Sequence, residues 1–285
     1  MFIVNASAKI CTKASYLIIF LILRLFRVIL LKINNNSSYY DIGVEPTMTV
    51  TFDGNVLSKP EKYVDWKDDS AKGTNNPTFN YPSATYAYDV TNYVNASNID
   101  TYYVTVANTK AYNGNDPSTT GDDKKSFNIQ AIGLLTLYNE SGSKVYDYWV
   151  DEGCDLTYLK CTDNSATPIV WQDNRKPSDT KCWANFSNVD NSSVSSVTLI
   201  TVAPSAGTEY NQIYLNSDPL AVFSGLWDGN PRDKDFSWDD TADVKDFLLN
   251  GQNYAIFHNG LDDDNSNTDG QMQAANAFLL VNKTA

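Results

Sequence analysis

Short segments of alternating apolar and polar residues recur along the chain. Residues 102–107 and 254–258 alternate in this way, which is typical of a strand with one buried face. Residues 127–138 form a longer apolar run that we expect to be a central strand. Turn-forming residues separate these segments, and the sequence contains no long amphipathic helix. The pattern predicts an all-β fold of antiparallel sheets, because parallel sheets need long crossover connections.

The second half of the chain repeats the first. Four blocks recur in the same order, and they pair residues 48–57 with 211–220, 89–94 with 243–248, 103–108 with 254–259, and 130–139 with 273–282. Self-similarity in a fixed order indicates two copies of one folding unit. We therefore predict two tandem antiparallel β-sandwiches, jelly-roll-like, that arose by internal duplication.

The repeat also predicts the domain boundaries. We assign the first sandwich to residues 17–153 and the second to residues 183–285, joined by a cysteine-bearing connector at 154–182. Residues 59–81, within the first copy, are expected to form a long polar loop. Residues 1–16 are assigned to a leader.

The apolar segment at residues 16–33 admits three interpretations. It has nearly the length of a membrane-spanning anchor, although Arg24 and Arg27 lie near its middle, where a charge is costly in hydrocarbon. A signal peptide is the second interpretation, but no small-residue cleavage site follows. In the third, residues 25–33 form the first core strand of copy one.

The overall charge excludes one class of partner. The formal net charge is -13, and only 5 of the 34 acidic residues are Glu. Such a surface repels phosphate backbones, so we expect no nucleic-acid partner. Asp favours turns where Glu favours helices, and aromatic residues, at 13%, suit strands.

Cysteines and glycosylation sequons bear on the compartment. Cys154, Cys161 and Cys182 are candidates for a disulfide of open connectivity, and no C-x-x-C motif indicates a metal instead. N-x-S/T sequons give the glycosylation candidates Asn95, Asn139, Asn185, Asn191 and Asn282. Asn139 and Asn282 occupy equivalent places in the two copies. The alternative is that both are simply turn residues.

Catalytic chemistry is weakly represented. His258 is the only histidine and lies in a predicted strand, so we expect it to be structural. No glycine-rich phosphate loop occurs. Carboxylate pairs such as Asp239 and Asp240 could hydrolyse glycosides, but acidic residues are too abundant for any one pair to be informative.

One acidic loop resembles the first half of a calcium loop. Oxygen ligands at alternate positions precede Gly270, which is the arrangement of an EF-hand start. The candidate calcium ligands are Asp262, Asp264, Asn265, Asn267 and Asp269. The twelfth position holds Asn276 instead of a bidentate Glu. The alternative is a polar surface loop.

Loop tryptophans are candidates for stacking on sugar rings. Trp66, Trp171 and Trp227 lie in predicted loops, where a flat exposed ring could contact a pyranose. The alternative is that these rings fill the bases of their loops. Trp149 alternates within a strand and is expected in the core.

Several motifs resemble known families. Residues 89–94 followed by Tyr-Tyr-Val-Thr-Val at 102–106 resemble jelly-roll sandwiches of the galactose-binding type. Residues 49–55 (Thr-Val-Thr-Phe-Asp-Gly-Asn), 88–91, 131–135 and 146–153 resemble the domain of unknown function 3344 family, which is found in surface proteins of methanogenic archaea. This resemblance covers about residues 44–285. It implies an exported, often adhesin-like envelope protein and supplies no catalytic residues.

These observations lead to a functional expectation. We expect a non-enzymatic, extracellular module of the cell envelope that is structural, adhesive or glycan-binding, with glycans or surface proteins as partners. Membrane contact would come only through an N-terminal anchor, and calcium is the one cofactor considered. The alternatives are a polysaccharide-degrading enzyme or its accessory module, and a purely structural envelope spacer.

Overall fold

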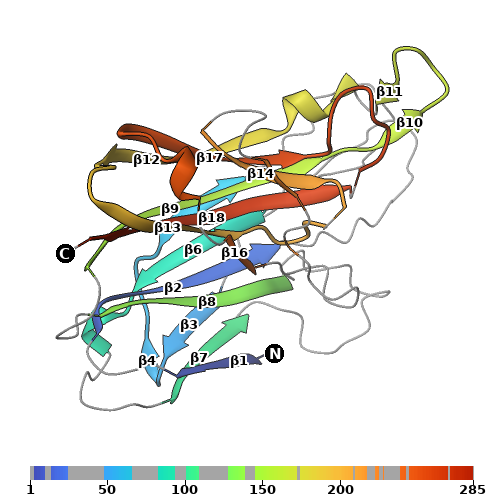
Figure 1. Cartoon of the computed structure of the whole chain (residues 1–285). Coiled ribbons are helices and arrows are strands. Elements are labelled where there is room, and N and C mark those ends of the chain that lie inside the picture. The colour runs from blue at the N-terminus through green and yellow to red at the C-terminus, as the bar shows by residue number, and fades with distance from the viewer. Residues whose placement is uncertain are drawn as a thin grey trace, which may run out of the picture. The chain divides into compact units, whose positions relative to one another are not determined.

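The computed structural model is all-β and contains two compact units, Met1–Ser141 and Gly142–Ala285 (Figure 1). It describes residues 3–9, 14–24, 48–65, 83–93, 101–108, 128–138, 145–171, 174–207, 209–216, 222–224, 227, 238–241, 244–268 and 270–284. Within these residues the helical elements are three-residue 3-10 turns. No helix in them is both long and apolar enough to span a membrane.

The first unit consists of two four-stranded antiparallel sheets. One sheet has the order β1 (Ile3–Lys9), β7 (Thr101–Asn108), β3 (Met48–Phe52) and β4 (Asn55–Val56). The other has the order β5 (Glu61–Asp65), β6 (Ser83–Asp89), β2 (Ala14–Arg24) and β8 (Asn128–Tyr138). The two sheets share one hydrophobic core, in which the Phe52 and Tyr102 rings stack with centroids 5.1 Å apart.

Local sequence explains two connections of this unit. The turn between β3 and β4 is made by Asp53 and Gly54, both with positive φ, which is the backbone that a tight two-residue hairpin turn requires. After β6, the Asp89 carboxylate accepts a hydrogen bond from the Thr91 N–H at 2.9 Å and begins the 3-10 turn η1 (Thr91–Tyr93).

The second unit also has two four-stranded antiparallel sheets. One has the order β12 (Lys181–Val189), β17 (Gly251–Asn259), β14 (Asn211–Leu215) and β15 (Val222–Ser224). The other has the order β16 (Trp238–Thr241), β13 (Val194–Val202), β18 (Gln271–Lys283) and β9 (Val145–Tyr158). The shorter elements are β10 (Cys161–Asp163), β11 (Val170–Trp171), η3 (Pro177–Asp179) and η4 (Lys245–Phe247).

One core joins both sheets of the second unit. Phe186 and Phe257 point into it from the first sheet, and Leu199 and Leu279 from the second. Strand β12 alternates strictly, with Cys182, Ala184 and Phe186 buried and the residues between them more exposed. The unit is therefore β-sandwich-like, two sheets packed face to face.

The strand orders of the two units correspond. The order β1-β7-β3-β4 matches β12-β17-β14-β15, and β6-β2-β8 matches β16-β13-β18. Three repeated sequence blocks fall on equivalent strand pairs, β3 and β14, β7 and β17, and β8 and β18, and the fourth falls at the turns η1 and η4. Strand β5 occurs in the first unit alone, and β9 extends the second.

The predicted boundaries need three corrections. Residues 145–153 do not close the first sandwich, because β9 pairs with β18 from Val145 to Tyr158 and belongs to the second unit. The expected connector at 154–182 instead contains the end of β9, then β10, β11 and η3. In the first unit, β5 forms inside the expected loop at 59–81, and β1 and β2 occupy much of the expected leader and anchor segment. Residues 25–33 lie outside the described residues.

Candidate functional site

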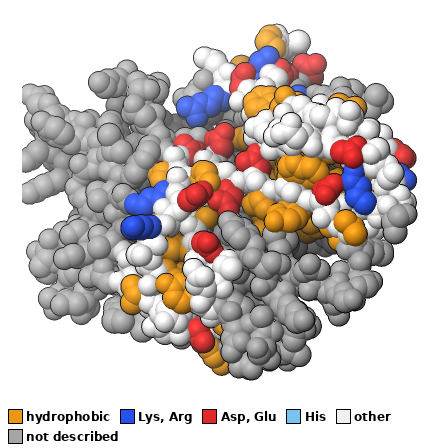
Figure 2. All heavy atoms as spheres, turned by 90° about the vertical axis from the view of Figure 1, so that its left-hand side faces the viewer, with side chains coloured by type: hydrophobic (Ala, Val, Ile, Leu, Met, Phe, Trp, Pro, Cys, Tyr) orange, Lys and Arg blue, Asp and Glu red, His pale blue; other side chains and the backbone are white. Residues whose placement is uncertain are grey.

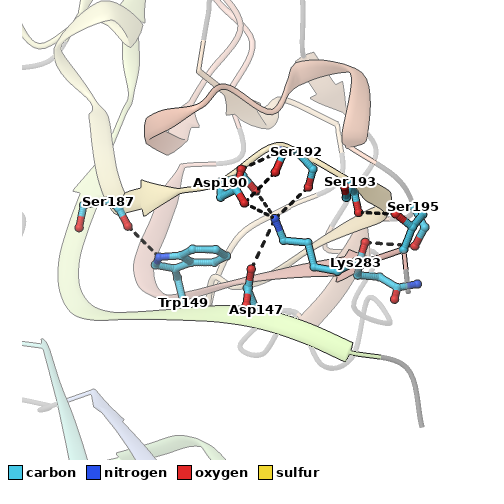
Figure 3. Close-up of polar contacts among 10 residues, drawn as sticks. Asp147, Trp149, Ser187, Asp190, Ser192, Ser193, Ser195 and Lys283 are labelled. Atoms are coloured by element: carbon cyan, nitrogen blue, oxygen red, sulfur yellow. Dashed lines mark hydrogen bonds and ion pairs between the residues drawn. The ribbon is translucent and has the colours of Figure 1, made fainter. Parts of the chain in front are cut away.

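Strands β9 and β12 are edge strands of the two sheets of the second unit, and side chains of β9 bind the edge of β12. The Trp149 indole donates a hydrogen bond to the Ser187 carbonyl at 2.8 Å (Figure 3). The Asp151 carboxylate accepts one from the Asn185 N–H, and the Cys182 thiol donates one to the Asp155 carboxylate at 3.1 Å. These contacts form a seam that satisfies backbone groups an edge strand would otherwise expose.

A β-bulge interrupts the seam and opens a cleft. Between the Asp155–Ala274 and Glu152–Asn276 pairs, Gly153 and Cys154 of β9 face Ala275 alone, and a bulge of this kind bends its strand. The resulting cleft has a volume of about 260 Å³ and is bordered by Gly153, Lys181 and Trp183, among other residues.

Two of the three acidic side chains that border this cleft, Asp151 and Asp155, accept hydrogen bonds from β12. Burial raises the pKa of Asp151, while hydrogen bonds from the Asn185 and Glu152 backbone lower it in part. The Cys182 thiol donates a hydrogen bond to the Asp155 carboxylate. These contacts therefore link β9 to the edge of β12.

An exposed aromatic pair lies on the outer face of the sheet next to the cleft. Asn185 of β12 is paired directly with Tyr254 of β17, and Trp183 lies two residues before Asn185, on the same face. The Trp183 side chain is 57% exposed and that of Tyr254 is 38% exposed. Figure 2 shows hydrophobic side chains gathered between acidic and uncharged ones on one face of the molecule. We call Trp183 and Tyr254 the aromatic pair.

His258 lies further along the same sheet and is structural in its contacts. Its Nδ1 is 2.9 Å from the Tyr214 hydroxyl, and its Nε2 is 3.0 Å from the Pro177 carbonyl. The ring is 3% exposed, and Lys181 Nζ lies 5.6 Å from the centre of the Tyr214 ring. The imidazole therefore links η3 to the sheet.

The expected glycan-stacking role is wrong for two of the three tryptophans. Trp171 is 6% exposed and Trp227 is 1% exposed. The Trp227 ring stacks on Phe257 with centroids 5.9 Å apart, and its indole donates to the Thr201 hydroxyl at 3.1 Å. Both rings are therefore closed to a sugar from solvent, and Trp171 lies in β11 instead of a loop. Trp66 lies outside the described residues.

The proposed calcium ligands are used locally. Asp262 accepts a hydrogen bond from the Asp264 N–H, and Asn265 accepts one from the Asn267 N–H, each at 3.0 Å. Within the described residues, no group of three or more acidic, cysteine or histidine side chains could hold a metal ion, and Asp269 is not described. Calcium binding stays a prediction, which thermal melting with millimolar calcium would test.

Asp263, which the sequence did not single out, ties this loop to η3. It forms an ion pair with Lys176 at 2.6 Å and accepts hydrogen bonds from the Ser178 N–H and hydroxyl, both at 2.9 Å. These contacts lower the pKa of Asp263, against the effect of its burial, which raises it. The Asp263 side chain therefore links this loop to η3.

The structure separates the glycosylation candidates. Asn282 is 4% exposed and its amide donates to the Ser196 hydroxyl at 3.3 Å, so the expectation of a glycan on folded Asn282 is wrong. Asn191 is exposed in the turn between β12 and β13, and its amide lies 3.4 Å from the Leu248 carbonyl. Asn185 is exposed on β12. Asn95 and Asn139 lie outside the described residues.

The three candidate cysteines are thiols in the structure. Cys182 is buried, whereas Cys154 and Cys161 are half-buried. Cys154 and Cys182 border the same cleft, and Cys161 belongs to the separate β10–β11 pair. The expected disulfide is thus not formed among these three residues.

Lys283 lies at the centre of a polar node in the second unit, which Figure 3 shows. Its ammonium group donates to the Ser192 carbonyl at 3.1 Å and to the Asp190 carbonyl at 2.5 Å. It also forms ion pairs with Asp190 at 3.2 Å and Asp147 at 3.6 Å. The node joins β18, β9 and the β12–β13 turn.

Sequence comparison places the chain in a family. Residues 31–282 match the family described as Protein of unknown function (DUF3344), and the chain belongs to this family. A comparison with curated proteins returns no match. The match agrees with the resemblance seen in the sequence motifs, and it brings no catalytic residue with it.

Proposed function

We propose that the chain is a non-enzymatic structural module of the cell surface. The observation that carries this proposal is the use of its reactive groups. Asp151, Asp155 and His258 each bind a strand edge or a turn of the second unit. These carboxylates and this imidazole thus stabilise the fold of the second unit, as expected of a structural module.

We also propose that the two units descend from one duplicated sandwich. The matched strand orders and the repeated sequence blocks support this origin. Tandem rigid units suit a surface protein, because they hold their connecting loops away from each core and toward possible partners.

Glycan binding is a second candidate function, and the aromatic pair favours it. Trp183 and Tyr254 offer flat apolar surface in water, which suits the apolar face of a pyranose. Their neighbours on this face, Asn185 and Gln252, add polar groups for hydroxyl contacts. A polysaccharide-degrading enzyme is less well supported, because two of the three carboxylates that border the cleft, Asp151 and Asp155, accept hydrogen bonds from β12.

Two experiments test whether the chain is a surface module or an enzyme. Intact cells of the native host would be treated with a membrane-impermeant amine-labelling reagent, and we expect labelled lysines in this protein but not in a cytoplasmic control. Absence of labelling, with the protein present in the lysate, would contradict the surface location. Release of reducing sugar from polysaccharides by the purified protein, lost in Asp151→Asn, would instead support the enzyme.

A further inference from the structure

Asn185 faces solvent from β12, whose opposite face is packed into the core of the second unit. The Phe186 side chain is fully buried in the core, and the Asn185 N–H is bound by the Asp151 carboxylate. Strand alternation then directs the Asn185 amide outward. Ser187 completes an N-x-S sequon, the acceptor sequence of N-linked glycosylation.

The aromatic pair flanks this amide on two sides. In an antiparallel sheet, directly opposed residues have Cβ atoms about 5 Å apart, and Tyr254 is the direct partner of Asn185. Residues two apart on a strand lie about 7 Å apart, which is the relation of Trp183 to Asn185. A sugar attached to Asn185 therefore meets aromatic surface at once, and covering that surface is favourable.

The other two sequons described in the second unit lack these features. Asn282 is buried and donates to Ser196. Asn191 is exposed, but the residue two positions before it, Val189, is buried in the core, and its amide points to the Leu248 carbonyl. Asn185 combines an exposed position with aromatic neighbours, and Asn191 is its natural control.

We propose that Asn185 carries an N-linked glycan whose first sugars lie against Trp183 and Tyr254. This inference rests on the proposed surface location. In the reaction, the Asn185 amide nitrogen forms a bond to the anomeric carbon of a sugar on a lipid phosphate donor. The nitrogen loses one proton, and the lipid phosphate leaves with the electron pair of the broken bond. The attached glycan then covers the aromatic pair, so this proposal excludes the same pair as the surface for the second candidate function, glycan binding.

Mass spectrometry of the protein from its native host tests the attachment. We expect the proteolytic peptide with Asn185 to carry sugar masses, and we expect these to disappear in Asn185→Gln and in Ser187→Ala, which leaves Asn185 itself in place. An unmodified Asn185 in protein recovered from the cell surface would overturn this inference alone. An unmodified Asn185 in protein confined to the cytoplasm would overturn the surface location as well.

Thermal melting tests the contact with the aromatic pair. We expect the glycosylated protein to melt about 2–4 °C above the unglycosylated protein, the shift that about 1 kcal/mol produces in a domain of this size. The double variant Trp183→Ala, Tyr254→Ala should abolish this difference, and Asn191→Gln should leave it unchanged. An undiminished difference in the double variant would overturn the contact.

Discussion

At the scale of single residues, two tryptophans of the second unit have a degree of burial opposite to the one that their sequence context predicts. Trp227 follows a Gly-Leu dipeptide in a predicted loop, yet it is fully buried against Phe257. Trp183 lies in a predicted strand, yet it is more than half exposed because β12 turns its odd-numbered positions outward. The difference lies in the tertiary packing: the Trp227 ring stacks on Phe257 in the core, whereas the Trp183 ring lies on the outer face of its sheet.

These two tryptophans make a matched pair for mutation. We expect Trp227→Ala to lower the free energy of unfolding by about 3–5 kcal/mol, because it leaves a cavity and an unpaired Thr201 hydroxyl. Trp183→Ala should change it by less than about 0.5 kcal/mol in unglycosylated protein. Denaturant titration of recombinant protein measures both values, and equal losses would contradict the assigned burial.

The Lys283 node predicts sensitivity to acid. Hydrogen bonds from Ser192, and then from Lys283, lower the pKa of Asp190 from 3.8 to about 2. Since the folded pKa lies below the unfolded one, this contribution to stability is present above about pH 4 and is lost as the pH falls toward 2. Asp190→Asn should flatten the acid limb of a melting-temperature profile over this interval.

Asp53 provides the control for that profile. It is exposed in the β3–β4 turn of the first unit, whereas the Lys283 node belongs to the second unit. Asp53→Asn should leave the slope between pH 4 and 2 close to that of the wild type. If both variants flatten the profile equally, general charge reduction and not the node explains the effect.

At the scale of elements, β9 decides how the second unit is closed. It extends β18 on one side and reaches β12 with Trp149, Asp151 and Asp155 on the other. Edge strands are prone to pair with other chains, and bulges and inward-pointing charges are common protections. Strand β9 combines both, because the Gly153–Cys154 bulge lies between Asp151 and Asp155.

Asp151 variants separate hydrogen bonding from charge. Asp151→Ala removes the acceptor of the Asn185 N–H and should cost about 0.5–1.5 kcal/mol. Asp151→Asn keeps an acceptor oxygen. Because burial raises the folded pKa of Asp151, the wild type loses stability as the pH rises through that pKa. Asp151→Asn should therefore equal or exceed the wild type at pH 7 in urea titration, and an Asn variant as unstable as Ala would contradict this argument.

At the scale of the whole molecule, two units with separate cores account for the chain. Each unit has two antiparallel sheets over its own hydrophobic cluster, and the family match extends over most of both. A chain of 285 residues suits this division, because single cores stop growing near that size.

Truncation tests where the units divide. We expect a fragment of residues 142–285 to fold cooperatively alone, because it retains both sheets and the β9–β12 seam. A fragment of residues 154–285 lacks most of β9 and leaves the β18 edge unpaired, so it should be unstable or aggregate. Circular dichroism melting and size-exclusion chromatography compare them, and equal behaviour would place the boundary at residue 153 as the sequence suggested.

The sequence by itself determined the all-β class, the Asp53-Gly54 turn and the repeat, because apolar alternation and turn residues are local properties of the chain. It also determined the family, through motifs that span both units. It missed β1 and β5, which lie in the expected leader and the expected polar loop. Tertiary structure alone decided that β9 pairs with β18 and that Trp171 and Trp227 are buried. It also decided that Asn185 is exposed to solvent whereas Asn282 is buried. Strand pairing and side-chain burial depend on contacts between residues that are far apart in the sequence, and a local pattern does not encode such contacts.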